Sequence, residues 1–187
     1  FSRCPSNEWR DALLKMKAGG VDIVATYVFW IHHEEVRGSY DWNGQRSLRE
    51  FLELCHELGL YAFVRLGPWS HGEVRNGGIP DWLQKPDKKA MQESAAAAAG
   101  PGTMGALQLV LPDELRTADP DFLKLAAGHY AEIAAQMKGL LWKDGGPVVA
   151  VQFDNESNDL PYLFALKKIA RELGVDEHSV VKTLVME

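Results

Sequence analysis

Four polar side chains lie at the end of one apolar run near the carboxyl end of the chain. Gln152, Asp154, Asn155 and Glu156 close the stretch 147–156, which reads PVVAVQFDNE. A strand that is apolar on both faces belongs in a parallel sheet covered by helices, and ligands in such folds lie beyond the carboxyl ends of the strands. The four side chains therefore indicate a site for chemistry. The alternative is a polar cluster that only caps the next helix.

Unusual side chains also follow two other strand-like runs, residues 22–30 (DIVATYVFW) and residues 60–66 (LYAFVRL). Aromatic rings beside carboxylates and amides suit a sugar, because the apolar sugar face stacks on the rings and the hydroxyls take charge-assisted hydrogen bonds. These strand ends therefore favour a carbohydrate ligand. The residues concerned are Tyr27, Trp30, His33 and Glu34 for the first run, and Trp69, His71, Glu73, Arg75 and Asn76 for the second.

Hydrolysis of a glycosidic bond would set the task of the carboxylates. The reaction requires two carboxyl groups, one of which is held protonated by its surroundings. A carboxyl group at a crowded, apolar strand end can have its pKa raised by desolvation. Glu156 is therefore a candidate general acid. The alternative is a carboxylate that lies at a helix start because the helix dipole favours it there.

Metal and nucleotide sites are weighed against this interpretation. The tripeptide HHE at 32–34 and the pair His71 and Glu73 contain ligand types for a metal. Neither has the HExxH helical spacing, and adjacent side chains on an extended segment point to opposite sides. Residues 76–78 (NGG) precede Ile-Pro rather than a helix, so they do not form a phosphate loop. We therefore expect no metal and no cofactor.

Helical and strand-like patterns alternate along the chain, which predicts an α/β fold with a parallel sheet and right-handed crossovers. Both a closed barrel and an open doubly wound sheet fit that order. Residues 84–115 contain an alanine run and a Gly-Pro-Gly, and we interpret them as a low-complexity insertion. The patterned segments are helices over 9–16, 48–58, 122–140 and 163–173, strands over 22–30, 60–66 and 147–153, and the start of a further strand over 180–186.

The composition is that of an ordinary globular protein. The 187 residues are 46% hydrophobic and 25% charged, with a formal net charge of -6, which argues against a nucleic-acid or anionic-membrane partner. Cys4 and Cys55 give no disulfide framework or metal spacing, and Cys55 is expected to be a buried, inert thiol. No apolar run approaches the ~18 residues of a membrane span. The chain opens on Phe1 without a signal-peptide pattern, and we expect its ends to be cut rather than natural.

Several multi-residue blocks, in order and at consistent spacing, resemble glycoside hydrolase family 35. The similarity runs from about residue 1 to residue 157 and is interrupted by the 84–115 region. Matching several blocks is far more specific than matching one motif. The blocks are 26–30 (TYVFW) with 33–34 (HE), 65–69 (RLGPW), Glu73 with 76–83 (NGGIPDWL), 116–117 (RT), 145–147 (GGP) and 152–156 (QFDNE).

The resemblance implies the architecture and the chemistry together. Members are retaining β-galactosidases whose catalytic domain is a (β/α)₈ TIM barrel, so residues 1–187 would be a partial barrel from the end of strand 1 to the start of strand 5. The carbohydrate substrate would be a β-galactoside, the remaining half of the barrel would lie in the full-length protein, and the location would be secreted or periplasmic. The family's nucleophile, a glutamate after the seventh strand, would lie outside this chain.

The resemblance also carries roles onto individual residues. Glu156 matches the general acid/base, and Asn155 matches the residue that bonds the sugar 2-hydroxyl. Tyr27 and Glu73 match sugar-binding positions, with Glu73 reaching the hydroxyls of the terminal galactose. His71 and Gly72 border the same pocket and are counted as substrate-binding residues.

The chain departs from the common family pattern at three places beside that pocket. Ile31 replaces an asparagine, Ser70-His71-Gly72 replaces Ile-Cys-Ala, and Asp154 replaces a glutamate. We interpret these changes as marking a divergent, bacterial branch with less strict galactose specificity. Two alternatives therefore stay open: another β-glycosidase of the same barrel type, acting on a β-glucoside or β-mannoside, and a non-catalytic sugar-binding or truncated homologue.

Overall fold

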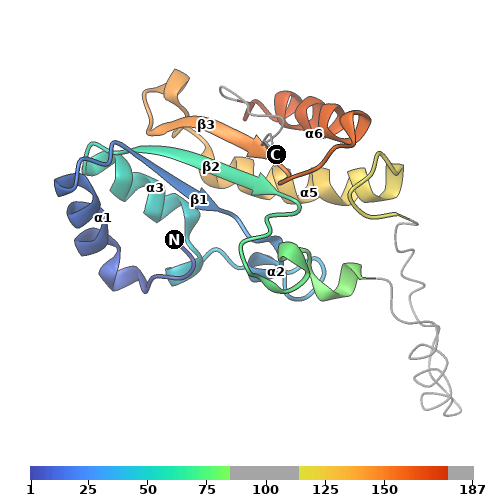
Figure 1. The fold of residues 1–187 in the computed structure, drawn as a ribbon, viewed down its shortest axis with the longest axis horizontal. Coiled ribbons are helices and arrows are strands. Elements are labelled where there is room, and N and C mark those ends of the chain that lie inside the picture. Colours follow the sequence, from blue (N-terminus) through green and yellow to red (C-terminus); the bar gives the residue numbers. More distant parts are fainter. Residues whose placement is uncertain (85–113, 177–187) are drawn as a thin grey trace, which may run out of the picture.

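The computed structural model describes residues 1–84 and 114–176, which form an α/β unit around a three-stranded parallel sheet (Figure 1). The strands are β1 (Ile23–Tyr27), β2 (Tyr61–Gly67) and β3 (Val148–Phe153), and they lie side by side in sequence order. The predicted α/β fold and parallel sheet are confirmed. The predicted insertion at 84–115, apart from its ends, and the strand at 180–186 lie outside the described residues.

The helices follow the strands along the chain and pack on one another in the same order. α1 contacts α3, α3 contacts α5 and α5 contacts α6, while α3 also packs on β2 and α6 on β3. Asp119 and Asp159 cap α5 and α6 by accepting hydrogen bonds from backbone N–H groups, and Ser47 caps α3 in the same way. The helices are α1 (Trp9–Ala18), α2 (Trp30–His33), α3 (Leu48–Glu57), α5 (Pro120–Met137) and α6 (Leu160–Glu172).

The core lies between the sheet and this row of helices. Ala62, Val64 and Leu66 alternate along β2 and are fully buried, as expected for the sheet face that helices cover. Cys55 of α3 is also fully buried, and burial raises the pKa of its thiol to about 11, so it is the inert thiol that the pattern predicted. None of the helices in the described ranges is long and apolar enough to cross a membrane.

The first predicted strand is corrected by the structure. The buried strand expected over residues 22–30 ends at Tyr27, and Trp30 begins the short helix α2. Ile23 is 52% exposed, because β1 pairs only with β2 among the described residues. Trp30 is buried by packing around α2 rather than in the sheet, so its apolar character did not indicate a strand.

The register brings the carboxyl ends of the strands to one edge of the sheet. Tyr27 is level with Arg65, and Arg65 is level with Gln152. The segments that follow β2 and β3 therefore begin next to each other, and a backbone hydrogen bond of 2.6 Å from the Asp154 N–H to the Gly67 carbonyl joins them. The predicted meeting of the strand ends is confirmed.

Candidate active site

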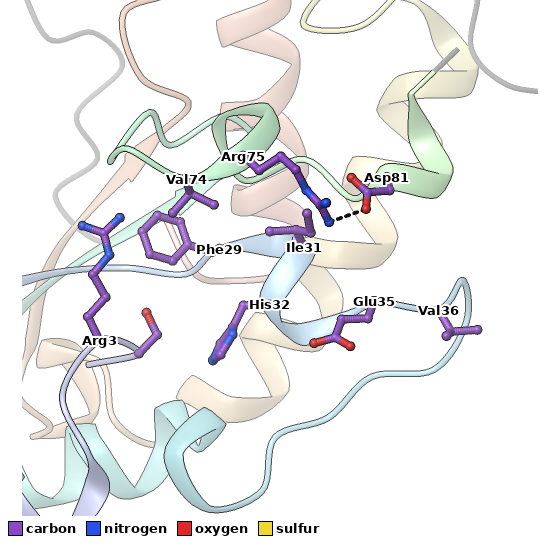
Figure 2. Close-up of a pocket in the computed structure, with 10 residues that line it drawn as sticks. Arg3, Phe29, Ile31, His32, Glu35, Val36, Val74, Arg75 and Asp81 are labelled. Carbon is purple, nitrogen blue, oxygen red and sulfur yellow. Dashed lines mark hydrogen bonds and ion pairs between the residues drawn. The ribbon is translucent and has the colours of Figure 1, made fainter. Parts of the chain in front are cut away.

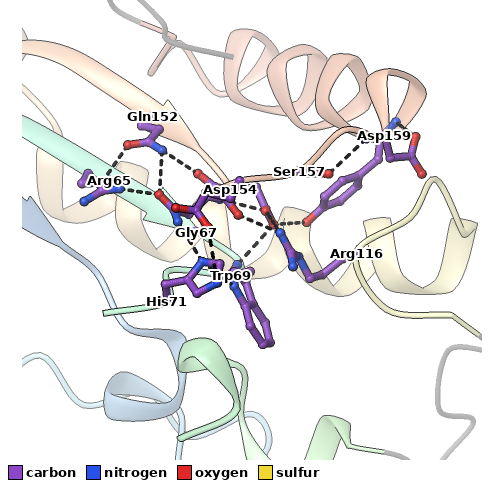
Figure 3. A network of polar contacts seen from close by, with 12 residues as sticks. Arg65, Gly67, Trp69, His71, Arg116, Gln152, Asp154, Ser157 and Asp159 are labelled. Atoms are coloured by element: carbon purple, nitrogen blue, oxygen red, sulfur yellow. Dashed lines mark hydrogen bonds and ion pairs between the residues drawn. The ribbon is translucent and has the colours of Figure 1, made fainter. Parts of the chain in front are cut away.

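Arg65 lies at one end of the polar network drawn in Figure 3 and connects it to the strands. Its Nε donates a hydrogen bond of 2.7 Å to Gln152, and its Nη atoms donate to the Tyr27 hydroxyl and to Asn155 Oδ1. The guanidinium carbon also lies 4.0 Å from the centroid of the Tyr27 ring. A charged side chain inside a strand needs such partners, because burial without them is costly. Arg65 thereby holds residues from all three strand ends in one arrangement.

Asp154 is a buried anchor rather than part of the solvent-facing surface. Its fully buried carboxylate accepts hydrogen bonds of 2.7 Å from Arg116, 2.7 Å from Tyr162 and 2.8 Å from the Asn155 N–H. Burial, and secondarily the negative charge of Asp154, raises the pKa of Tyr162 well above its usual range, so this phenol remains a donor. Arg116 also donates to the Asn155 carbonyl, at 2.7 Å. These contacts fix the backbone on which Asn155 and Glu156 lie.

His71 connects the two strand-end segments. Its Nδ1 lies 3.0 Å from Trp69 Nε1 and 2.8 Å from Asn155 Nδ2, and its Nε2 lies 3.6 Å from Glu156 Oε2. The contacts with Asn155 and Glu156 join residues that are more than eighty positions apart in the sequence. The structure therefore brings four of the predicted site residues together: Tyr27, His71, Asn155 and Glu156.

Glu156 lies at the open side of this network. Its side chain is 47% exposed, so the crowded, apolar surroundings that the sequence argument expected are not provided by the described residues. Asp154, two residues earlier, is the carboxylate that the described residues bury, and the backbone at Glu156 is left-handed (φ 55°). The crowded surroundings of Glu156 stay a prediction for the full-length protein.

Glu73 and Gly72 are the predicted site residues that the network does not include. The Glu73 side chain is 93% exposed, and its carboxylate lies 3.9 Å from an Arg3 Nη atom. Arg3 also donates a hydrogen bond to the Gly72 carbonyl. A Cβ added at Gly72 would lie 3.1 Å from the Phe29 ring, so the segment passes close to that aromatic side chain. Both residues are near the network in sequence but belong to the rim formed with Arg3.

Left-handed backbone conformations gather at this edge of the sheet. Non-glycine residues rarely adopt positive φ, and such strain tends to persist where the surrounding structure requires it for function. The non-glycine residues with positive φ among those described all lie in the segments after β2 and β3 or contact them: His71, Glu73, Asn76, Arg116, Asp154 and Glu156. The geometry is evidence for a site, independent of the residue types.

A cavity of about 600 Å³ lies beside the network and is shown in Figure 2. Phe29 and Ile31 supply its apolar wall, and Arg3, His32 and an ion pair between Arg75 and Asp81 supply polar groups. None of the predicted site residues lines it. Ile31, one of the three departures from the family pattern, therefore faces this neighbouring cavity.

The histidines of the sequence HHE at 32–34 do not form a metal site. Burial lowers the pKa of His33 to about 3, and its ring stacks on Trp42 with centroids 4.0 Å apart. Glu34 accepts a hydrogen bond of 2.6 Å from Trp30. In the part of the chain that the structure describes, no group of three or more His, Cys, Asp or Glu side chains could hold a metal ion.

From the sequence, Arg65 and Arg116 are only members of blocks that resemble the family, and Tyr162 has no predicted role. Arg65 carried a usable signal, since it is the one charged residue in the run LYAFVRL and must find partners there. Arg116 and Tyr162 reach the site from a distant loop and from α6, so no local pattern could have identified them.

An α/β fold with a polar network at the carboxyl ends of parallel strands defines the class of protein, and comparisons give the family. The model of glycosyl hydrolases family 35 matches residues 1–97 and 105–186. The chain belongs to this family, and the resemblance seen in its sequence blocks is confirmed. The match is interrupted at residues 98–104, inside the predicted insertion.

Relatives of known name agree with this assignment. The chain is 38% identical to an exo-β-D-glucosaminidase of Thermococcus kodakarensis over 83% of its own length and 20% of that protein. It is 35% identical to the β-galactosidases of Bos taurus and Homo sapiens over 94% of its own length, which is 24% and 23% of those proteins. The chain thus spans about a quarter or less of the length of these relatives.

A solved structure supports the fold. An exo-β-1,4-mannosidase from Opitutaceae bacterium strain TAV5 superposes with a TM-score of 0.59 at 18% identity, covering 89% of this chain and 26% of that chain. At that identity the likeness concerns the fold alone. A glycosidase therefore contains an arrangement of strands and helices similar to the one described for this chain.

Proposed function

We propose that this chain is part of the (β/α)₈ catalytic domain of a retaining β-galactosidase, comprising residues from the end of barrel strand 1 to the start of strand 5. The support is the sequential parallel order of β1, β2 and β3, the row of helices that follows the same order, and the family match. In this proposal the rest of the barrel and the nucleophile lie in the full-length protein, and residues 84–115 are an insertion in the domain.

Glu156 is the general acid/base of the proposed reaction. It protonates the leaving oxygen in the first step and removes a proton from water in the second, while a carboxylate outside this chain forms the glycosyl-enzyme bond. The single observation that carries this role is the position of Glu156: it lies at the open side of the strand-end network, next to an Asn155 whose amide is held by Arg65. Asp159, and not Glu156, caps the helix that follows, so the alternative role of a helix-start carboxylate is taken by another residue.

Asn155 is proposed to bind the sugar 2-hydroxyl as a donor. Its Oδ1 already accepts from Arg65 and, at 3.3 Å, from Gln152, so both lone pairs of that oxygen are used. One Nδ2 proton is directed at His71, and the other has no partner among the described residues. The amide can therefore donate one hydrogen bond to a hydroxyl oxygen but cannot accept one.

Tyr27, Glu73 and Gly72 complete the proposed sugar site, with His71 beside them. The Tyr27 ring stacks with Phe29 at a centroid distance of 5.3 Å, and the Arg65 guanidinium lies over the same ring. These two contacts hold the ring in place. The exposed carboxylate of Glu73 is free to accept from sugar hydroxyls, at the cost only of its loose contact with Arg3. These assignments rest on the matched family positions together with their location at one edge of the sheet.

A β-glucosaminide is the second candidate substrate, because of the 38% identity to an exo-β-D-glucosaminidase. That sugar carries an amine in place of the 2-hydroxyl, and a protonated amine can only donate. The donor-only state of Asn155 therefore favours a hydroxyl at this position, and with it a galactoside. β-Glucosides and β-mannosides remain alternatives to be compared in the same assay.

The test is a Glu156→Gln variant of the full-length protein, assayed on aryl β-galactosides. We expect turnover of phenyl β-galactoside to fall by about 10²–10⁴-fold, the usual contribution of general acid catalysis, and turnover of the dinitrophenyl substrate to fall much less in the glycosylation step. Glu57→Gln, at an exposed ion pair on α3, is the matched control and should retain full activity. Equal activity of the Glu156 variant and the control would refute the acid/base assignment.

A substrate panel of nitrophenyl β-galactoside, β-glucoside, β-mannoside and β-glucosaminide tests the specificity. The highest kcat/KM is expected for the galactoside. A preference for the glucosaminide would show that Asn155 does not act as described. Sugar binding without turnover of any of the four substrates would establish the non-catalytic alternative.

A further inference from the structure

The hydrogen-bond network determines the orientation of the Asn155 amide. A guanidinium has donors only, so the Asn155 atom that faces Arg65 must be the carbonyl oxygen. Gln152 Nε2 faces the same oxygen at 3.3 Å and is also a donor. The amide nitrogen of Asn155 is therefore the atom that lies 2.8 Å from His71 Nδ1.

The same reasoning determines the tautomer of His71. Asn155 Nδ2 can only donate, and so can Trp69 Nε1, which lies 3.0 Å from the same ring nitrogen. Nδ1 of His71 must then be the acceptor, and the neutral ring carries its proton on Nε2. Nε2 is the atom that faces the Glu156 carboxylate, 3.6 Å from Oε2.

We propose that His71 is a positioning residue for Glu156. The Nε2–H of His71 points at Oε2 of Glu156, and the other oxygen, Oε1, is left to carry the proton that is transferred. The separation of 3.6 Å is slightly longer than a direct hydrogen bond, and rotation of the half-exposed Glu156 side chain closes it. The inference rests on the proposed acid/base role of Glu156 and adds a residue to it. His71 replaces the cysteine of the common family pattern, so this device belongs to the branch that carries the change.

The backbone supports this arrangement on both sides. His71 and Glu156 both have left-handed backbone, with φ of 54° and 55°, a conformation that residues with a side chain rarely adopt. Gly77 allows Trp69 to reach His71, because a Cβ at Gly77 would lie 2.3 Å from the Trp69 ring. The segment is thus built so that the Trp69 indole and the His71 imidazole meet.

The arginines near His71 contact the residues that touch its ring, Asn155 and Trp69, and not the ring itself. Arg65 contacts the far side of the Asn155 amide. Arg116 lies 4.6 Å from the Trp69 ring centroid and pairs with buried Asp154. Glu156 is therefore the ionisable group that directly faces the imidazole among the described residues.

Two substitutions separate the two nitrogens of His71 in the full-length protein. His71→Asn keeps an acceptor near the position of Nδ1, removes the Nε2 donor, and suits the left-handed backbone. His71→Gln keeps a donor near the position of Nε2. The measurements are kcat and KM on phenyl and dinitrophenyl β-galactosides, with Glu57→Gln as the control.

The Nε2 donor fixes which carboxylate oxygen of Glu156 is left to deliver the proton, so its removal should slow the reaction most where the leaving group needs that proton. We expect His71→Gln, which keeps a donor near that position, to retain most of the rate on phenyl β-galactoside. Turnover of phenyl β-galactoside should fall about tenfold in His71→Asn, as for the loss of one hydrogen bond to a charged group, with little change on the dinitrophenyl substrate.

The outcomes distinguish this inference from the function on which it rests. Equal rate losses of His71→Asn on both substrates overturn the positioning role while the effect of Glu156→Gln still stands. If Glu156→Gln itself has no effect, the proposed function fails first. A purely structural role of His71 predicts the same moderate loss in both His71 variants and on both substrates.

Discussion

Histidine serves two opposite purposes in two neighbouring regions of this molecule. In the strand-end network, formed by Arg65, Gln152, Asp154, Asn155 and His71, each side chain meets directed partners, and both ring nitrogens of His71 face other polar atoms. In the histidine cluster, formed by His33 and His129 with Trp30 and Trp42, each imidazole stacks on an indole ring.

The cluster shows how burial converts a titratable group into a core residue. His129 stacks on Trp30 with centroids 4.7 Å apart and planes 8° from parallel, and burial lowers its pKa well below the usual value. His33 lies between Phe1 and Trp42, and its Nε2 has no hydrogen-bond partner in the described ranges. Both rings are neutral at ordinary pH, so they contribute packing rather than chemistry.

Hydrogen-bond partners, and not burial, distinguish the polar groups of the network from those of the cluster. Asp154 is as deeply buried as His129, yet its oxygens meet Arg116 and Tyr162. A buried polar group with directed partners fixes the geometry of its neighbours, whereas one without them only fills space.

Breaking the Asp154 anchor should have the largest effect. Arg116→Met leaves a fully buried carboxylate without its counter-charge, and we expect the free energy of unfolding to fall by about 3–5 kcal/mol. Denaturant unfolding of the full-length protein measures this. In the double variant with Asp154→Asn, most of the loss should be recovered, since no charge is then left unpaired. Additive losses in the double variant would contradict the pairing.

Crowding the Trp69 contact should have the next largest effect. Gly77→Ala places a methyl group 2.3 Å from the Trp69 ring at a residue with φ of 58°, and we expect a cost of about 3 kcal/mol from overpacking and backbone strain together. Gly20→Ala is the matched control, because Gly20 also has positive φ (87°) but nothing within 4 Å. Its cost should be about 1–2 kcal/mol, from the backbone alone. Equal losses in the two variants would show that the close approach is unimportant.

Acid should destabilise the histidine cluster through His33. The pKa of His33 is about 3 in the folded chain against 6.5 as the ordinary value, so the unfolded state binds a proton more readily. The stabilisation is fully present above pH 6.5 and is lost as the pH falls toward 3. At pH 5 we expect His33 to cost about 2 kcal/mol relative to pH 7. His33→Phe should remove that part of the pH dependence, as measured by urea midpoints at the two pH values, and an unchanged slope would argue against it.

Replacing His71 should have the smallest effect on stability. Its side chain is 46% exposed, so His71→Asn should change the free energy of unfolding by less than about 1 kcal/mol while it lowers turnover of phenyl β-galactoside. His129→Asn should show the reverse, a stability loss with the same ratio of rates on the phenyl and dinitrophenyl substrates. Thermal unfolding of both variants, measured beside these rates, tests the difference between the two regions.

Much of the fold could be predicted from periodicity. The strand expected over residues 60–66 is β2 (Tyr61–Gly67), and that over 147–153 is β3 (Val148–Phe153), because a buried parallel strand requires a continuous apolar run. The first strand was predicted too long, since Val28 and Trp30 are buried just as fully by other contacts. Apolar character indicates burial but does not indicate which element provides it.

The site could be predicted less completely. The family blocks pointed to Glu156 and Asn155, and the parallel register explains why Tyr27 lies near them. The contact of His71 with Asn155 depends on left-handed turns in two separate segments, which no local pattern in a single sequence reveals. The catalytic and sugar-binding roles of these residues stay predictions until the variants are assayed.

The 187-residue chain alone offers one more check of the partial-barrel proposal. Leu160 and Phe164 of α6 are 52% and 60% exposed, and Ile23 lies at an open sheet edge. We expect the isolated chain to be poorly soluble and inactive, because unpaired edges and apolar surface favour association. Turnover of a nitrophenyl β-galactoside by the isolated chain would contradict the need for the other half of the barrel.

The alternation of backbone handedness after β3 has a consequence for insertions and deletions. The backbone is left-handed at Asp154 and at Glu156. The three successive side chains therefore have different surroundings: Asp154 contacts Arg116 and Tyr162, Asn155 contacts His71, and Glu156 lies at the open side. Moving this tripeptide by one position along the strand would place Phe153 or Asn155, neither of which is a carboxylate, next to Tyr162 and Arg116. Length is therefore constrained here as tightly as residue type, and a single-residue indel would be more damaging than most substitutions.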